Sequence, residues 1–368
     1  MMVRLLLPII LALSACTSRP VVQTPLPEPA EVVLNYSSKI LADPFNVSIV
    51  LFNGKTSEVS RIYAPIREAE SAYLPVQLRN TLDESGYWGA VNVVPSKDVA
   101  AELLVTGKIV ESDAVTLALD IEVRDSRGHV WFSKVYRDYA MDYAMDYATD
   151  YGLEVLENTT TDPFQDLFNQ IANDMSEAQS LLQANDRLRI LDTSMLRYAM
   201  LLSPEAFSRY LIVDEFGEIA MQGLPARNDP LYSRVRQIRE REFSMQDVVD
   251  EHFENFYDDM QKIYPFWRQS SYELLVYNNQ LEGRQRKGPR AGSWAAVESV
   301  YRTYKELKLN EDELRELASS FEREISPTVT EMEGRVIELQ GSLSSQYKTW
   351  RRLLREIYAE TTGTMPGL

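Results

Sequence analysis

Cys16 is the single cysteine of the chain, and its thiol could carry a covalent modification. It follows an apolar run from Leu5 to Leu13, which is preceded by the cation of Arg4 and closed by the small residues Ser14 and Ala15. A positive residue, an apolar stretch of this length and small residues, in this order, predict a secretory signal. The competing interpretation is a buried, unmodified cysteine near the terminus.

The segment Leu13-Ser14-Ala15-Cys16 resembles the lipobox of bacterial lipoproteins. The resemblance implies that residues 1–15 are removed and that Cys16 becomes a diacylglycerol-modified amino terminus with a further acyl chain such as palmitate. Two acyl chains already give stable anchoring, since each buried methylene contributes about 0.8 kcal/mol. Thr17 stands where many inner-membrane lipoproteins have Asp, so the resemblance favours the periplasmic face of the outer membrane, with the inner membrane as the alternative.

A second group with chemical potential is the cationic stretch "EGRQRKGPRAGSW", which runs from Glu282 to Trp294. Its Gly and Pro residues predict a loop, and its four cations are Arg284, Arg286, Lys287 and Arg290. Guanidinium groups match carboxylates and phosphates bidentately, so this loop could bind lipid A phosphates, cell-wall carboxylates or an acidic protein. The alternative is that these cations pair with surplus carboxylates of the chain itself.

The two histidines give little support for catalysis or metal binding. His129 falls in a predicted hairpin turn, and His252 lies in a run of carboxylates that we interpret as a solvated acidic face. A di-iron helical bundle needs Glu three residues before the histidine, where this chain has Val249. No nucleophile elbow, nucleotide-binding loop or zinc-protease motif occurs, so we expect no catalytic residues, no metal and no cofactor.

Composition narrows the function classes further. The 368 residues include 38 Lys and Arg against 55 Asp and Glu, a net charge of −17, which disfavours nucleic-acid binding. After Ala15 no apolar run approaches the roughly 18 to 20 residues that span a bilayer. With one cysteine, the fold has no disulfide and depends on packing, as a chain of this size permits.

The elements that must position these groups fall into two kinds. Residues 16–43 are rich in Pro and predict an extended tether behind the lipidated cysteine. Residues 44–138 alternate a buried strand, a helix from Arg67 to Tyr87 and four further β-rich runs joined by turn signals. This order predicts a small α/β sandwich domain in which a helix packs on a mostly antiparallel sheet.

Within residues 45–137 a family resemblance is carried by Gly107, Asp125, Gly128 and Trp131, in the segments "ELLVTGKIVES" and "VRDSRGHVWFSKVY". They resemble the small α/β domain of TolB amino-terminal, CsgG-like and LpoB-type periplasmic proteins. The resemblance implies a role in regulating a cell-wall synthase or in assembling a secretion channel. The alternative is a generic α/β domain with coincidental turns.

The rest of the chain predicts helices. A tyrosine repeat at positions 139, 143, 147 and 151 marks a connector over residues 139–161, for which a tandem duplication is the simpler interpretation and an aromatic binding ladder the other. Residues 162–368 predict a helical, partly coiled-coil-like domain, with one apolar seam from Val249 to Trp267 and another from Val329 to Ile357. We expect Pro265 to kink the first long helix and Asn310 to begin a shorter one.

The sequence therefore predicts an α+β fold and a non-enzymatic, periplasm-facing lipoprotein. It would be attached to the membrane by the lipid on Cys16 and would act as a scaffold or accessory that binds an envelope protein partner or associates with itself. We expect no nucleic-acid partner. The alternative is an enzyme or transport accessory that acts on envelope polysaccharide or lipid, with carboxylates as acid and base.

Overall fold

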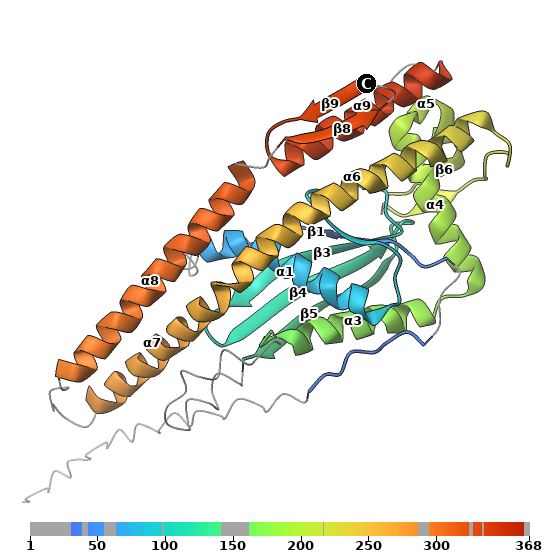
Figure 1. Ribbon diagram of the computed structural model, residues 1–368. Coiled ribbons are helices and arrows are strands. Elements are labelled where there is room, and N and C mark those ends of the chain that lie inside the picture. The colour runs from blue at the N-terminus through green and yellow to red at the C-terminus, as the bar shows by residue number, and fades with distance from the viewer. Residues whose placement is uncertain are drawn as a thin grey trace, which may run out of the picture.

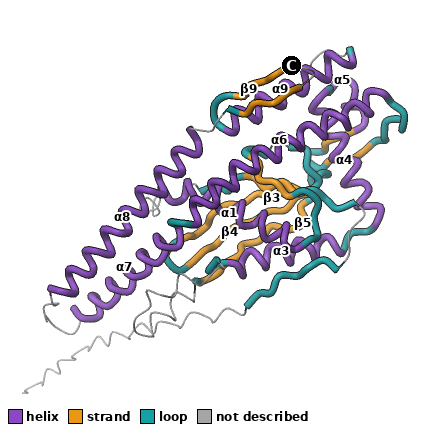
Figure 2. The backbone as a smooth tube through the Cα atoms, viewed as in Figure 1, coloured by secondary structure: helices purple, strands orange, loops and turns teal. Residues whose placement is uncertain are grey.

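The computed structural model describes residues 31–38, 43–54, 64–97, 99–140, 162–215, 217–285, 294–323, 327–332 and 335–363. It confirms the α+β class: a five-stranded sheet with helices is followed by a larger helical region (Figure 1). Figure 2 shows the strands of this sheet gathered in one place, with long helices running past them.

The sheet contains β1 (Val47–Val50), β2 (Val91–Val94), β3 (Leu103–Ser112), β4 (Thr116–Asp125) and β5 (Val130–Tyr139), in the order β2-β1-β3-β4-β5. The three long strands pair antiparallel, as expected, whereas β1 lies parallel to both β2 and β3. The sheet is therefore mixed. The parallel pairing of β1 with β2 follows from helix α1 (Ala64–Ser85), which crosses between the two strands.

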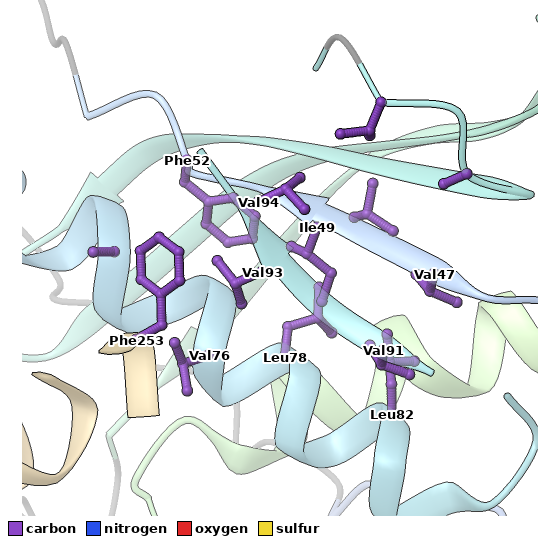
Figure 3. Packing of buried hydrophobic residues seen from close by; sticks show 14 of the residues in the cluster. Val47, Ile49, Phe52, Val76, Leu78, Leu82, Val91, Val93, Val94 and Phe253 are labelled. Carbon is purple, nitrogen blue, oxygen red and sulfur yellow. The ribbon is translucent and has the colours of Figure 1, made fainter. Parts of the chain in front are cut away.

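Helix α1 covers the sheet with a face of aliphatic side chains. In Figure 3, Leu78 and Leu82 of α1 lie against Ile49 and Val91 of the sheet. Phe253, which belongs to α6 (Pro230–Gln261), enters the same cluster and is 1% exposed. The apolar interior is thus shared by the sheet and the helical region.

The helical region begins with α3 (Gln165–Ser180), α4 (Ala184–Leu202), the short α5 (Pro204–Phe207) and a single 3-10 turn, η2 (Ser208–Tyr210). A two-stranded hairpin, β6 (Leu211–Val213) and β7 (Ile219–Met221), follows. Asp162 accepts a hydrogen bond from the Phe164 amide at 2.8 Å, so it orders the entry to α3 as a capping residue does.

Helix α6 is followed almost in line by α7 (Tyr264–Gln285), as Figure 1 shows. The break between them is caused by Pro265, whose ring would clash with the carbonyl of Gln261, the last residue of α6. Pro265 itself lies in the first turn of α7, where its missing N–H costs nothing. The helix is thus interrupted just before Pro265, where the sequence predicted a kink.

Helix α8 (Trp294–Arg323) runs back along α7, and we name this helical pair the arm. Here two predictions were wrong. Asn310 is not a helix start, because it lies in the middle of α8. Gly283 and Arg284 are not in a loop either, because α7 continues to Gln285.

The chain ends in the hairpin of β8 (Thr328–Met332) and β9 (Arg335–Leu339), followed by α9 (Leu343–Thr362). The predicted helical seam from Val329 to Leu339 is therefore wrong, whereas its continuation from Leu343 lies on α9. Thr328, Val329, Thr330, Val336 and Ile337 are β-branched and favour extended backbone, which outweighs the apolar spacing.

Of the predicted connector, residues 139–161, the structure describes only Tyr139, which is the last residue of β5, and Ala140, so the domain boundaries stay predictions. On either side of it, the buried apolar residues form one cluster that runs from Leu34 through the sheet to Tyr358 of α9. Among the described helices, none is long and apolar enough to cross a membrane.

Candidate functional site

Arg268 on α7 is among the most deeply buried charges of the described chain, with a side chain that is 0% exposed. Its guanidinium donates hydrogen bonds to Ser112 Oγ at 2.7 Å and to Glu70 Oε1 at 3.2 Å. It also donates to the Tyr264 hydroxyl and to the Asp113 carbonyl. These contacts join α7 to α1 and to the end of β3, so this buried cluster holds elements together.

Two similar pairs lie elsewhere in the interior. Arg239 of α6 donates to Glu102 Oε1 at 2.7 Å and to Ser194 Oγ of α4 at 2.8 Å. Arg79 of α1 pairs with Asp250 of α6, which also accepts from the Val93 amide at 2.9 Å. In each pair the carboxylate is held by an arginine from another helix or strand, so these pairs join elements of the fold.

The best candidate for a ligand site is a pocket of about 490 Å3, which we name the turn pocket. It lies beside the turn between β4 and β5, between the end of α3, the start of α4 and β7. Its lining residues are Arg127, His129, Trp131, Ala178, Leu181, Leu182, Asp186, Glu218 and Ile219.

Asp125, which is 2% exposed, organises one wall of the turn pocket. Its Oδ2 accepts from the Arg127 guanidinium at 2.7 Å and from the Trp131 indole N–H at 3.2 Å. Arg127 also reaches Asp186 at 3.1 Å. The turn needs glycine at residue 128, where φ is +85° and an added Cβ would lie 2.5 Å from the Gly217 carbonyl oxygen. Asp125, Gly128 and Trp131 are three of the four residues that carry the family resemblance.

The turn pocket combines an aromatic ring held in place, aliphatic side chains and a few polar groups, which is the usual character of a ligand site. His129 Nδ1 lies 3.7 Å from Glu218 Oε1, and their side chains are 60% and 61% exposed. Carboxylates in contact with water accept hydrogen bonds from hydroxyl groups. The geometry therefore suits a ligand that carries hydroxyl groups.

Most of the site residues predicted from the sequence lie outside the part of the chain that the structure describes. Cys16, Arg286, Lys287 and Arg290 lie outside the described residues, and of Arg284 only the backbone is described, one residue before the end of α7. His252 lies on α6 with a partly exposed side chain. The described residues contain no group of three His, Cys, Asp or Glu side chains suited to a metal ion.

Sequence reasoning missed the buried arginines and the function of Asp125 in the turn pocket. One signal was available: Arg268 directly follows Trp267 of the apolar seam, on a stretch that is otherwise packed inside. A cation in such a place needs a buried acid, although the sequence does not say which one.

Comparisons with known proteins give little to build on. No family model matches the chain, and no curated protein matches it. A solved structure described as the PelC L103M dodecamer from Paraburkholderia phytofirmans is similar over 39% of this chain and 94% of that chain, with 18% sequence identity and a TM-score of 0.22.

Proposed function

We propose that this chain is a lipoprotein anchored through Cys16 that faces the periplasm and acts as a non-enzymatic scaffold or accessory in envelope protein complexes. The order Arg4, apolar run, Leu13-Ser14-Ala15-Cys16 supports the anchor. The observation that carries the scaffold function is the arm, whose far end extends beyond the sheet and the helices that cover it (Figure 1).

The arm presents a surface suited to a protein partner. On α8, Tyr301 is 64% exposed, Tyr304 is 49% exposed and Leu309 is 63% exposed. Tyrosine is enriched at protein interfaces, where its ring buries much area at a small entropic cost. Arg302 and Lys305 lie exposed on the same helix, between or next to these residues.

Charge separates the end of the arm from the rest of the chain. Residues 276–308 contain seven Lys and Arg against three Asp and Glu, a net charge of +4, whereas the remainder of the chain carries −21. A local charge of opposite sign steers and orients association with an acidic surface. The partner that fits is an envelope protein with acidic and aromatic-binding patches.

The anchor is tested by replacing the cysteine. The Cys16→Ser protein should remain unacylated and leave the membrane fraction, while the folded region is unchanged. Mass spectrometry of the amino-terminal peptide should find a triacylated or diacylated Cys16 in the wild type and none in the variant. A variant that stays with the membrane and migrates like the mature wild type would show that the anchor assignment is wrong.

The contact function of the arm is tested by charge reversal. Changing Arg302 and Lys305 to Glu should abolish co-purification of the partner that the wild type retains from solubilised envelopes. A matched control reverses two exposed cations outside the arm, Lys262 and Arg352, whose side chains are 70% and 65% exposed. Equal loss in both variants would mean that only the total charge matters and that the arm is not the contact.

The turn pocket supports a second candidate function, that of an accessory that binds envelope polysaccharide. Sugar rings pack their apolar faces on aromatic side chains, and their hydroxyls donate to carboxylates such as Asp186 and Glu218. Trp131→Ala should then weaken binding to purified envelope polysaccharide, measured by calorimetry, whereas Lys134→Ala outside the pocket should not. Equal affinity of both variants would remove this candidate.

A further inference from the structure

A pocket of about 270 Å3 lies between α4, α6 and α9, on a part of the molecule that the proposed function does not use. One wall is the face of α9 that carries Lys348, Arg351 and Arg355. These residues are three and four positions apart, so a helix places their side chains in one row. Three cations along one pocket wall are unusual in a chain with a net charge of −17.

Only one of these three cations has an acidic partner among the described residues. Glu242 of α6 lines the same pocket, and its Oε1 lies 3.7 Å from Arg351 Nε and accepts from the Tyr347 hydroxyl at 3.0 Å. Arg355 Nε makes a 3.5 Å hydrogen bond to the Arg351 carbonyl, which leaves its charge uncompensated. Lys348 is exposed at the pocket rim with no ion pair in the described chain.

The other walls of the pocket are apolar. Leu202 of α4 and Leu354 of α9 are buried, and Leu201 is 37% exposed. Tyr198 adds a phenol at the base and is 3% exposed. Burial and the neighbouring Glu242 carboxylate raise the pKa of Tyr198 well above its ordinary value, so its hydroxyl stays protonated.

We infer that this pocket binds a phosphate monoester attached to an apolar carrier. Once Glu242 and Arg351 balance each other, Lys348 and Arg355 leave a charge of +2. A phosphate monoester carries about −1.5 to −2 at pH 7 and matches it, whereas a carboxylate would leave one cation unpaired. Arg355 offers the planar fork that binds phosphate oxygens, Lys348 adds a point charge, and the leucine walls accept a short hydrocarbon.

The first test uses the full chain with Cys16→Ser, so that an acyl anchor does not contribute to lipid binding. Calorimetry measures the binding of inorganic phosphate and of butyl phosphate, at a constant ionic strength set with sodium chloride. Both should bind, butyl phosphate more tightly because of its apolar chain. Replacing Lys348 and Arg355 together by Ala should weaken binding about tenfold or more.

The matched control is Arg352→Ala, since Arg352 lies on the same helix, is 65% exposed and is not a lining residue of the pocket. Its affinity for phosphate should equal that of the parent chain. Equal affinity of the Lys348/Arg355 variant and the control, with circular dichroism showing both folded, would overturn the inference. So would phosphate binding that is no stronger than chloride binding.

A second variant separates a ligand site from a merely structural cluster. Glu242→Gln keeps the shape of the side chain but removes the one negative charge, so phosphate should bind several-fold more tightly. Weaker or unchanged binding in the folded variant would contradict the assignment. The source of the phosphate is distinguished by vesicles: phosphatidic acid in phosphatidylcholine should retain the protein if a lipid supplies the group, and phosphatidylcholine alone should not. Binding of butyl phosphate without vesicle retention would assign a soluble phosphate ester.

Discussion

Cationic side chains in the interior of the molecule are buried and paired with carboxylates, whereas those on the surface of the arm are exposed. In the interior, Arg67, Arg79, Arg239 and Arg268 have side chains that are at most 10% exposed, and each one contacts a carboxylate. On the arm, Arg302 and Lys305 are exposed, and the end of the arm carries an excess of positive charge.

This difference separates cohesion from contact. A buried charge that loses its partner costs several kcal/mol, so the interior arginines fix α1, α4, α6 and α7 around the sheet. An exposed charge contributes about 0 to 1 kcal/mol to folding and is therefore free to be arranged for a partner. The comparison can be broken or sharpened by changing one region at a time.

The largest effect should come from Arg268, because its removal leaves Glu70, which is 0% exposed, without one of its two cations. Arg268→Met should lower the free energy of unfolding by about 3–5 kcal/mol, measured by urea denaturation. Lys262→Met, on an exposed cation six residues earlier, is the control and should change it by less than about 1 kcal/mol. Similar losses in both variants would erase the distinction between the two regions.

Asp138 at the end of β5 tests the effect of a buried acid on stability. It is 6% exposed, and burial raises its pKa to about 6. Between pH 3.8, the ordinary pKa of the group, and pH 6, the carboxyl of Asp138 is protonated in the folded state and ionised in the unfolded state. The free energy of unfolding therefore falls as the pH rises from about 4 through 6. Asp138→Asn should remove this penalty, raising the free energy of unfolding by up to about 3 kcal/mol at pH 8.

At pH 4 the same substitution should change little, because the carboxyl is then protonated in the folded wild type. Urea denaturation at the two pH values measures the difference. A stabilisation of equal size at both values would mean that packing, and not ionisation, explains the effect of Asp138→Asn.

The turn between β4 and β5 offers a smaller, purely steric test. Gly128→Ala should cost about 1–2 kcal/mol for its positive φ and more for the contact with the Gly217 carbonyl. Gly217→Ala is the matched control: its φ is +83°, and an added Cβ would meet nothing within 4 Å. The midpoint of thermal unfolding should therefore be lower for Gly128→Ala than for Gly217→Ala. The reverse order would show that the two turns do not pack as described.

The smallest effect on stability should come from the arm. Reversing Arg302 and Lys305 to Glu should change the free energy of unfolding by less than about 1 kcal/mol per residue, because these side chains are exposed. Lys308 is left unchanged, because it pairs with Glu311, a carboxylate that is only 5% exposed. A loss of several kcal/mol in urea denaturation would show that these cations stabilise the fold as the interior arginines do.

Much of the sheet could be predicted from the sequence. Alternating apolar residues and turn signals located all five strands, and Leu74, Leu78 and Leu82 located α1. The parallel pairing of β1 was not predicted, because strand order depends on long-range packing. The hairpin of β8 and β9 was mistaken for a helix, because its apolar spacing fits both structures and only the β-branched residues favour strands.

The candidate sites were less predictable for a different reason. The turn pocket needs Asp186 of α4 and Glu218 beside β7 to reach Arg127 and His129, and these two contacts join residues 59 and 89 positions apart. The pairing of Arg268 with Glu70 spans 198 positions. Composition identified surplus acids and clustered cations, but which acid meets which cation is decided by the fold.

The central claim, that an anchored scaffold makes its contacts through the arm, is tested most directly by site-specific photo-crosslinking in intact cells. A photoreactive side chain at Tyr304 should give one discrete adduct with an envelope protein, whereas the same group at the exposed Glu205 on the body should give none. The adduct should disappear when Cys16 is changed to Ser or when Arg302 and Lys305 are reversed. An adduct at Glu205 and none at Tyr304, or a Tyr304 adduct that survives both changes, would contradict the account.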